Sequence, residues 1–431
     1  MRTVRAVMSV AAAWIALVPA PVRAAGYSIY EQGAAVLGMG GAGVASVSDA
    51  SAVFYNPAAI SRLEGTQVLA GGTLLSPATS FSGVAPYPGY GVTEEMTRQN
   101  FFPPTFYATR RFAGEWAMGA GFNSPYGLGI EWKNPDTFTG RYIVTKADVR
   151  ALQGNLSLAW SRSPKLSFGA GADVLYGRAL LHNREQAIIP GGGGGVVDVA
   201  KVDLESDYKP GWGWNAAVLY QPEPEWKVAL SYHSKIVVHS SGNADFTQIF
   251  TGDAALDAAV TAGLPPHQGV STVLRFPGWW TGAVAVSPEP QWTLEADVNF
   301  FEWSVFEDLP IHFHQTPSAD VTLPENYNDS WQFRLGVEHR LESFTYRVGY
   351  YYDQAAAPSE SVTPILPDAS RNGITAGLGF KLGAAKRLSL DLYELALFFN
   401  RRSTLGVERD GYNGEYKSYV NAAGVGLSYH W

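Results

Sequence analysis

Residues that could carry out chemistry occur in this 431-residue chain, but their spacing does not indicate a catalytic site. Residues 38–43 read GMGGAG and match the GxGxxG pattern of dinucleotide-binding loops. Such a loop binds phosphate only between a strand and a helix of a βαβ unit, and neither is indicated around this stretch. Ser, His and acidic residues are plentiful, yet no GxSxG or similar motif places a nucleophile beside a base. We therefore expect no enzyme activity and no bound nucleotide.

The best candidates for metal ligands are His312 and His314. Two imidazoles leave a zinc site incomplete, and the spacing indicates no third ligand, so solvated loop histidines are the simpler interpretation. The glycine run at residues 191–195 lacks the Lys-Ser/Thr pair of a phosphate-binding loop, and the chain contains no Cys for thiolate chemistry. The sequence thus predicts neither a metal site nor a cofactor.

The composition favours strands that meet a membrane. The chain contains 46 Gly, and aromatic residues make up 13% of it while charged residues make up only 16%. This balance suits strands and interfacial aromatic girdles better than an ordinary soluble enzyme. The formal net charge of -8 argues against nucleic acid as a partner.

The first 24 residues have the pattern of a secretory signal peptide. Arg2 and Arg5 precede an apolar run at residues 6–18, and small residues at the cleavage positions end with Ala24. A membrane anchor is the alternative, but the run is shorter than the roughly 20 apolar residues of a spanning helix. We expect residues 1–24 to be removed and the mature chain to be exported.

From residue 66 to the C-terminus, apolar and polar residues alternate in about 14 segments of roughly ten residues. In a membrane, one face of such a strand meets lipid and the other lines a lumen, so Glu295, Asp297 and Arg347 are expected to point inward. Short links alternate with long ones, which is the layout of an outer-membrane barrel with tight turns at one end. The predicted fold is all-β, a transmembrane antiparallel β-barrel of about 14 strands at residues 66–431.

A barrel that spans lipid must close, because an open edge would leave backbone groups unpaired in hydrocarbon. The last segment, residues 418–431, places Tyr429 and Trp431 on its outward face. A terminal aromatic residue that follows another aromatic resembles the signal by which such barrels are recognised for assembly, so we expect the barrel-assembly machinery to bind Trp431. A soluble β-sandwich or propeller that ends in Trp by chance is the alternative.

Residues 25–65 lie between the leader and the first strand and are rich in Gly, Ala and Ser. The stretch lacks a sustained amphipathic period and would bury little apolar surface alone. We therefore expect it to fold inside the barrel as a plug. Within it, Asn56 is expected to satisfy local backbone groups and Pro57 to fix the turn.

Four features of the mature chain occur together in the order found in one family. They are Ala25-Gly26-Tyr27 at the mature start, Asn56-Pro57-Ala58, Asn123-Ser124-Pro125-Tyr126-Gly127-Leu128 at the end of the third strand, and the aromatic C-terminus. In this the chain resembles the FadL family of outer-membrane transporters for hydrophobic compounds. The resemblance implies a 14-stranded barrel in the bacterial outer membrane whose N-terminal segment of about 40 residues, a hatch, fills the lumen.

The resemblance also implies roles for individual residues. Substrate would pass from an outer loop groove to an apolar pocket near the hatch and leave sideways at a kink in the third strand. Pro125, with Asn123 and Ser124, would open that gap, because Pro removes a ladder donor; the alternative is that Pro125 begins the next loop. Tyr27 would contact the bound ligand, and plain lumen packing is the alternative. For Asn56, with Pro57 and Ala58, a structural role in the hatch is preferred over ligand contact.

The chain departs from the fatty-acid members where they offer cations to a carboxylate. The position of their arginine falls on Asn183, with Arg184 next to it, and residues 307–330 contain no Lys or Arg. A buried carboxylate without a cation is costly. Either Arg184 with loop histidines binds the carboxylate, or the cargo is an uncharged aromatic or aliphatic hydrocarbon. Loops near Phe246 and Phe250 are expected to make the first contact with the cargo.

The leading functional hypothesis is passive uptake of hydrophobic small molecules by a monomer in contact with outer-membrane lipid and lipopolysaccharide. A general porin is the second hypothesis, and it predicts an open lumen and a large conductance. A lipid-hydrolysing barrel enzyme is the third, although the sequence offers no candidate serine. An adhesin is the fourth, and its deletion would leave hydrocarbon uptake unchanged.

Overall fold

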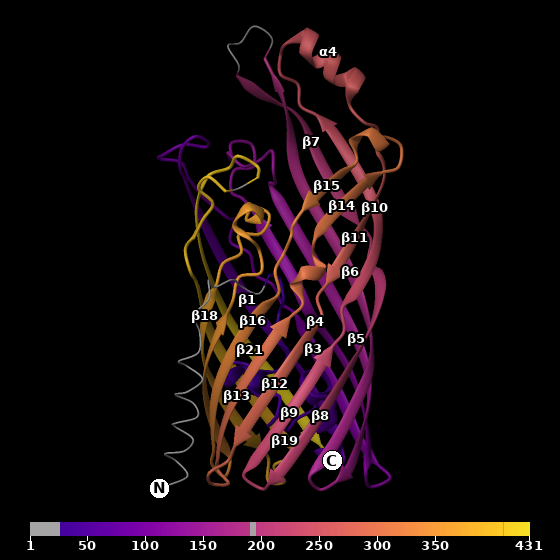
Figure 1. The fold of residues 1–431 in the computed structure, drawn as a ribbon, viewed down its shortest axis with the longest axis vertical. Coiled ribbons are helices and arrows are strands. Elements are labelled where there is room, and N and C mark those ends of the chain that lie inside the picture. The colour runs from indigo at the N-terminus through magenta and orange to yellow at the C-terminus, as the bar shows by residue number, and fades with distance from the viewer. Residues whose placement is uncertain (1–25, 190–194, 408) are drawn as a thin grey trace.

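The structure is a computed structural model that describes residues 26–189, 195–407 and 409–431. The expected signal peptide, residues 1–24, lies outside the described residues. Fourteen strands of the described part form a closed antiparallel ring, which confirms the predicted fold class (Figure 1). In ring order they are β1 (Thr66–Gly83), β3 (Pro104–Phe112), β4 (Trp116–Glu131), β5 (Lys146–Ser163), β6 (Leu166–Ile188), β8 (Lys209–Glu223), β9 (Trp226–His233), β12 (Trp279–Val286), β13 (Trp292–Phe301), β16 (Ser330–Arg340), β17 (Phe344–Asp353), β18 (Arg371–Leu382), β19 (Leu388–Phe399) and β21 (Gly414–His430).

The last strand closes the ring on the first. β21 pairs with β1 along the whole length of β1 from Gln67 opposite His430 to Gly83 opposite Gly414. Beyond the last pair, the Thr66 and Trp431 backbones exchange two hydrogen bonds of 2.9 and 3.0 Å. The terminal residue is therefore part of the closure that a membrane requires of a sheet.

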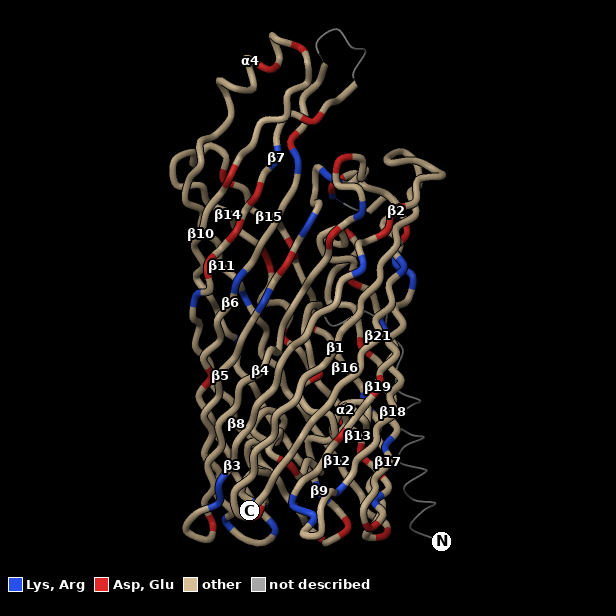
Figure 2. Tube along the Cα trace, turned by 180° about the vertical axis from the view of Figure 1, so that it is seen from behind, with Lys and Arg blue, Asp and Glu red and all other residues tan. Residues whose placement is uncertain are grey.

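The strands owe their membrane-facing surface to the period-two pattern. Along β12, Trp280 and Val284 are exposed on the outside while Thr281 is buried. Glu295, Asp297 and Arg347 are buried in the lumen, as the sequence predicts. Charged residues gather at the short turns and at the loop end, and few lie on the wall between them (Figure 2). Among the described residues, no helix is both long and apolar enough to cross a membrane.

The loop end carries a second tier of strands that continue the wall upward (Figure 1). β6 pairs there with β7 (Val196–Ser206), β7 with β10 (Ile236–Gln248), and β10 with β11 (Gln268–Phe276). β11 in turn pairs with β14 (Asp308–Phe313), and β14 with β15 (Val321–Pro324). β11 and β12 follow each other closely along the chain and are interrupted at Pro277, which has no N–H for the ladder.

The remaining elements are short. α4 (Ala254–Gly263) tops the second tier, and the Asp253 side chain caps it by accepting from Ala255 N and Leu256 N. The others are β2 (Thr93–Glu95), β20 (Arg402–Ser403), η2 (Trp303–Val305), η3 (Pro317–Ala319) and η4 (Ser359–Ser361).

Residues 26–65, here called the lumenal segment, lie inside the barrel. They contain α2 (Ala34–Gly38), α3 (Ala52–Tyr55) and η1 (Pro57–Arg62). Their backbone is bound by lumenal side chains of the wall. Asp297 accepts from Gly43 N at 2.9 Å and Val44 N at 3.1 Å, Glu295 accepts from Ala45 N at 2.6 Å, and the Arg334 guanidinium donates to Gly40 O at 2.9 Å. Charged side chains of the wall thus satisfy backbone groups of residues 40–45, which lie between α2 and α3 and have no regular secondary structure.

Asn56 fixes a turn in this segment. Its side chain donates to Val44 O at 2.7 Å and accepts from Ala58 N at 3.1 Å, and Pro57 begins η1 directly after it. All three residues of the motif are buried. Asn56 therefore connects two turns of the segment that are 12 residues apart.

Several glycines of the barrel strands allow the lumenal segment to pack directly against the wall. A Cβ on Gly349 of β17 would stand 2.0 Å from Gly40 N, and a Cβ on Gly169 of β6 would stand 2.3 Å from the Pro57 carbonyl carbon. Gly336 and Gly377 face Met39 and Gly38 in the same way. Any larger residue at these positions would push the segment off the wall.

We expect the substitution Gly349→Val to loosen the lumenal segment without opening the ring, at the cost of about 1–3 kcal/mol that is typical of overpacking. Amide hydrogen exchange of the detergent-solubilised protein should become faster at residues 38–45. The matched control is Gly282→Val on β12, where a Cβ meets nothing within 4 Å. Equal exchange rates in the two variants would contradict this interpretation of the glycines.

Candidate functional site

The third strand of the ring, β4, is irregular at the motif that the sequence singled out. β4 pairs with β5 up to Asn123 opposite Gln153, and the pairing resumes with Tyr126 opposite Ala151. Two residues, Ser124 and Pro125, therefore stand against the single residue Leu152, which is the arrangement of a β-bulge. Pro125 lies within β4 and does not begin the next loop.

On its other side, β4 loses its partner at the same height. Its last pair with β3 is Phe122 opposite Phe106, and the next backbone bond on this side is donated by Thr97 N to Glu131 O at 2.6 Å. Among the described residues, 123–130 make no backbone hydrogen bond to this neighbouring stretch. The wall therefore has a gap in its hydrogen bonding between residues 97–103 and residues 123–130.

The lumenal segment binds three backbone groups of β4 at the gap. Ile29 N donates to Pro125 O at 2.8 Å, and Gly127 N donates to Tyr27 O at 3.0 Å. The Gln32 side chain donates to Ser124 O at 2.8 Å. The segment thus acts as a short replacement strand against the inner face of β4.

A cavity of about 540 Å³ extends from the lumen to this gap. Its size is in the usual range of small-molecule sites. On the lumenal side it is lined by Leu366, Leu395 and Leu397. At the gap it is lined by Phe101, Phe102, Pro103, Pro104 and residues 126–130. Phe102 is 70% exposed on the outside of the wall. The ion pair of Asp148 and Arg150 on β5 also lines the cavity, so the lining is mainly but not wholly apolar.

Tyr27 lies at the inner wall of this cavity within a group of aromatic rings. Its ring centroid is 4.8 Å from that of Trp303, 5.8 Å from Phe306 and 6.2 Å from Phe276, and its hydroxyl donates to Arg275 O at 3.1 Å. Gly26 precedes it with φ +55°, and a Cβ there would overlap the Trp303 ring. Tyr27 therefore touches the cavity and the packed rings at once.

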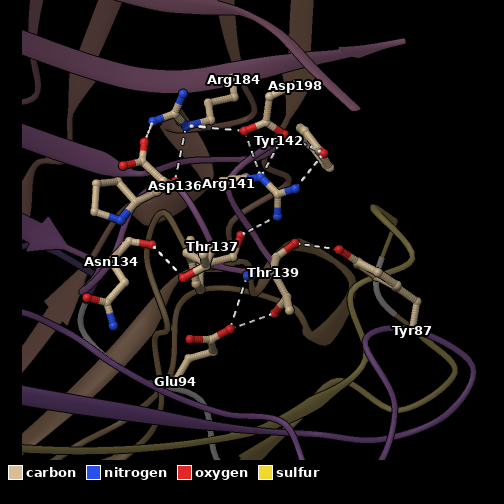
Figure 3. A network of polar contacts seen from close by, with 12 residues as sticks. Tyr87, Glu94, Asn134, Asp136, Thr137, Thr139, Arg141, Tyr142, Arg184 and Asp198 are labelled. Atoms are coloured by element: carbon tan, nitrogen blue, oxygen red, sulfur yellow. Dashed lines mark hydrogen bonds and ion pairs between the residues drawn. The ribbon is translucent and has the colours of Figure 1, made fainter. Parts of the chain in front are cut away.

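Arg184 lies elsewhere, in a polar network at the loop end (Figure 3). It forms ion pairs with Asp136 and, at 3.6 Å, with Asp198, and its Nε donates to Pro135 O at 3.1 Å. Asp198 also accepts from Arg141 Nε at 2.9 Å and from the Tyr142 hydroxyl at 2.7 Å. Two carboxylates thus already surround the Arg184 guanidinium, which does not line the cavity. Its contact with cargo stays a prediction.

The two phenylalanines proposed for first contact are also apart from the cavity. Phe246 on β10 is partly buried, with its ring 5.9 Å from that of Phe313. Phe250 is 75% exposed just before α4. Of the four expected ligand contacts, only Tyr27 lines the cavity. Ser124, which was expected to take part in the side exit, lines it as well. Roles in cargo binding for Phe246 and Phe250 stay predictions.

Sequence reasoning missed most of the cavity lining. The run Phe101-Phe102-Pro103-Pro104 was a usable signal, because apolar residues that cannot continue a ladder precede a strand there. Leu366, Asp368 and Arg371 carried no such signal, since nothing in their spacing connects them with β4.

Comparisons with known proteins agree with this architecture. The chain is 25% identical over 383 residues to the long-chain fatty acid transport protein of Salmonella typhi, which covers 84% of this chain and 85% of the relative. It is 26% identical over 455 residues to outer membrane protein P1 of Haemophilus influenzae, with 94% and 95% covered.

Solved structures show the same fold. The crystal structure of a Pseudomonas aeruginosa FadL homologue superposes with a TM-score of 0.82 at 20% identity, covering 94% of this chain and 100% of that one. The Ralstonia pickettii toluene transporter TbuX superposes with a TM-score of 0.69 at 20% identity, covering 93% and 98%.

A family model for outer membrane protein transport proteins (OMPP1/FadL/TodX) matches residues 15–431, nearly the whole chain. With its ring of fourteen strands, this chain belongs to the OMPP1/FadL/TodX family of bacterial outer-membrane proteins.

Proposed function

We propose that this outer-membrane protein is a passive channel that takes up hydrophobic small molecules, fatty acids or hydrocarbons, and releases them sideways into the membrane. The observation that carries the proposal is the mainly apolar cavity that runs from the lumen to the gap beside β4. A solute that stays in such a cavity keeps its apolar surface out of water, which is worth about 25 cal/mol per Å². The relatives are named as transporters of long-chain fatty acids and of toluene, and both cargoes are hydrophobic small molecules.

In this proposal the lumenal segment is the hatch. It fills the barrel and would block water-soluble solutes, while Tyr27 and Ile29 meet both the cavity and the β4 bulge. Cargo that displaces the Tyr27 ring would move the residues that cover the gap. Asn56, Pro57 and Ala58 would hold the rest of the hatch in place.

The proposal includes the partners expected from the sequence. The ring closes within one chain, so a monomer needs no second chain to complete its barrel. Trp431 is 55% exposed at the outer face of the last strand, which supports its recognition by the barrel-assembly machinery. The exposed loop-end residues, Phe250 among them, would meet cargo among the saccharides of the outer leaflet.

Uptake by cells tests the proposal directly. Cells that express this chain should take up oleate, toluene or both faster than cells with an empty vector, because the chain provides an apolar path through the outer membrane. A water-soluble sugar serves as the control and should enter equally in both strains. Equal uptake of every apolar compound would refute the proposed function, and faster sugar uptake would support a general porin instead.

Removing the extra residue of the bulge tests the sideways exit. Deletion of Pro125 leaves Ser124 alone against Leu152, so β4 loses the bulge and the bend that a bulge gives to a strand. Residues 126–130 should then lie closer to residues 97–103, and the gap should narrow. We expect apolar uptake to fall to the level of the empty vector. Pro125→Ala is the matched control, since it restores an N–H but keeps the extra residue and the bulge. A deletion variant that shows the heat-dependent gel mobility of a folded barrel and transports normally would exclude this exit.

A further inference from the structure

The lipid-facing surface of the barrel is hollowed near the turn end. The hollow has a volume of about 610 Å³ and crosses four neighbouring strands, β3, β4, β5 and β6. Four alanines line it, together with the larger and exposed side chains Met118 and Leu156; the alanines are Ala108, Ala120, Ala170 and Ala172. The wall is therefore recessed where its outward-facing side chains are small.

This hollow begins directly below the gap beside β4. The last residues that pair between β3 and β4 are Phe106 and Phe122, and both are exposed on the outside of the wall. Ala108 lies opposite Ala120, two residues farther toward the turn. The hollow and the gap thus share the β3–β4 seam, but the hollow lies on the turn side of the last phenylalanine pair.

A row of aromatic residues marks the membrane interface beneath the hollow. Phe112 lies opposite Trp116, Trp116 opposite Trp160, and Trp160 opposite Phe168, so the row crosses the same four strands. The Trp116 and Trp160 rings stack with their centroids 5.9 Å apart. Aromatic girdles lie at the level of the lipid head groups, and the short turns of such barrels are periplasmic. The hollow therefore faces the inner, phospholipid leaflet.

Arg110 lies at the polar end of the hollow. Ala108, Arg110 and Phe112 share the outward face of β3, so Arg110 stands between the small residues and the aromatic row. It is exposed, and it lines the hollow together with Thr66, which lies opposite it on β1. Within the described part of the chain, the Arg110 guanidinium has no carboxylate or hydrogen-bond partner.

A cation on the lipid-facing side of a barrel is costly unless it reaches water or an anion. The phosphate of a phospholipid is an anion at the right depth, and a planar guanidinium can bind it through two parallel hydrogen bonds. Lipid tails are as apolar as the wall, so the hydrophobic effect alone would not hold one lipid here. The charge of Arg110 and the fit of a chain over the alanines would select it.

We propose that this hollow binds one phospholipid of the inner leaflet, with its phosphate on Arg110 and Thr66 and one acyl chain over the alanines toward the gap. The inference goes beyond the proposed uptake function and does not depend on it. A lipid bound in this way lies beside the seam at which the wall is open.

Native mass spectrometry of the protein purified in detergent tests this, with dipalmitoylphosphatidylglycerol and dipalmitoylglycerol as probes. The two lipids have the same chains, and only the first has a phosphate. The wild-type protein should bind one copy of the phosphatidylglycerol about fivefold more tightly than the diacylglycerol, as about 1 kcal/mol for one arginine beside an anionic lipid implies.

Two pairs of variants separate the head from the chain. Arg110→Gln should remove the preference for the phosphate. Its matched control is Arg111→Gln, because Arg111 is an exposed neighbour that donates to Gly114 O at 2.7 Å in the turn and does not line the hollow. Ala120→Phe should fill the hollow and weaken the binding of both lipids. Its control is Ala376→Phe, an exposed alanine of β18 outside the hollow.

The possible results decide between occupants. Equal binding of the two lipids by the wild-type protein, or equal effects of the two arginine variants, would exclude the phosphate site. Equal effects of the two alanine variants would show that the chain does not lie in the hollow. A dimer mass that only Ala120→Phe abolishes would assign the hollow to a second copy of the chain instead. The comparison of the two lipids on the wild-type protein decides even if a variant fails to fold.

Discussion

Backbone groups inside a lipid bilayer must be paired within the protein, and this requirement governs the whole structure. It closes fourteen strands into a ring and brings Trp431 back to Thr66. It also makes any sideways opening expensive, because a gap in the wall frees N–H and C=O groups at membrane depth. At the β4 bulge the lumenal segment binds some of those groups, since Ile29 N donates to Pro125 O and Gly127 N donates to Tyr27 O. The segment therefore lowers the cost of the gap by pairing backbone groups that β3 leaves unpaired.

The lumenal segment is bound differently on its two sides. Toward β13 and β16 it is held by charged side chains, with Asp297, Glu295 and Arg334 bound to backbone groups of residues 40–45. Toward β4 it is held mainly by neutral hydrogen bonds of residues 27–32. Hydrogen bonds to charged groups are roughly twice as strong as neutral ones. On the proposed mechanism, the part that meets the cavity can move while the part on the charged wall keeps the lumen filled.

The sequence was sufficient for features that repeat along the chain and insufficient for those that form across the ring. Period-two alternation predicted the barrel strands and the inward charges, and Pro125 was singled out because a proline disturbs a ladder. The cavity could not be predicted in this way, because Tyr27, Phe101, Leu366 and Arg371 meet only after the ring has closed. The resemblance to the family pointed to Arg184 as a cation for the cargo, but Arg184 forms ion pairs with Asp136 and Asp198. The spacing of residues along a strand predicts which face of the strand each side chain takes. The distance between residues on different strands depends instead on all the strands that lie between them in the ring.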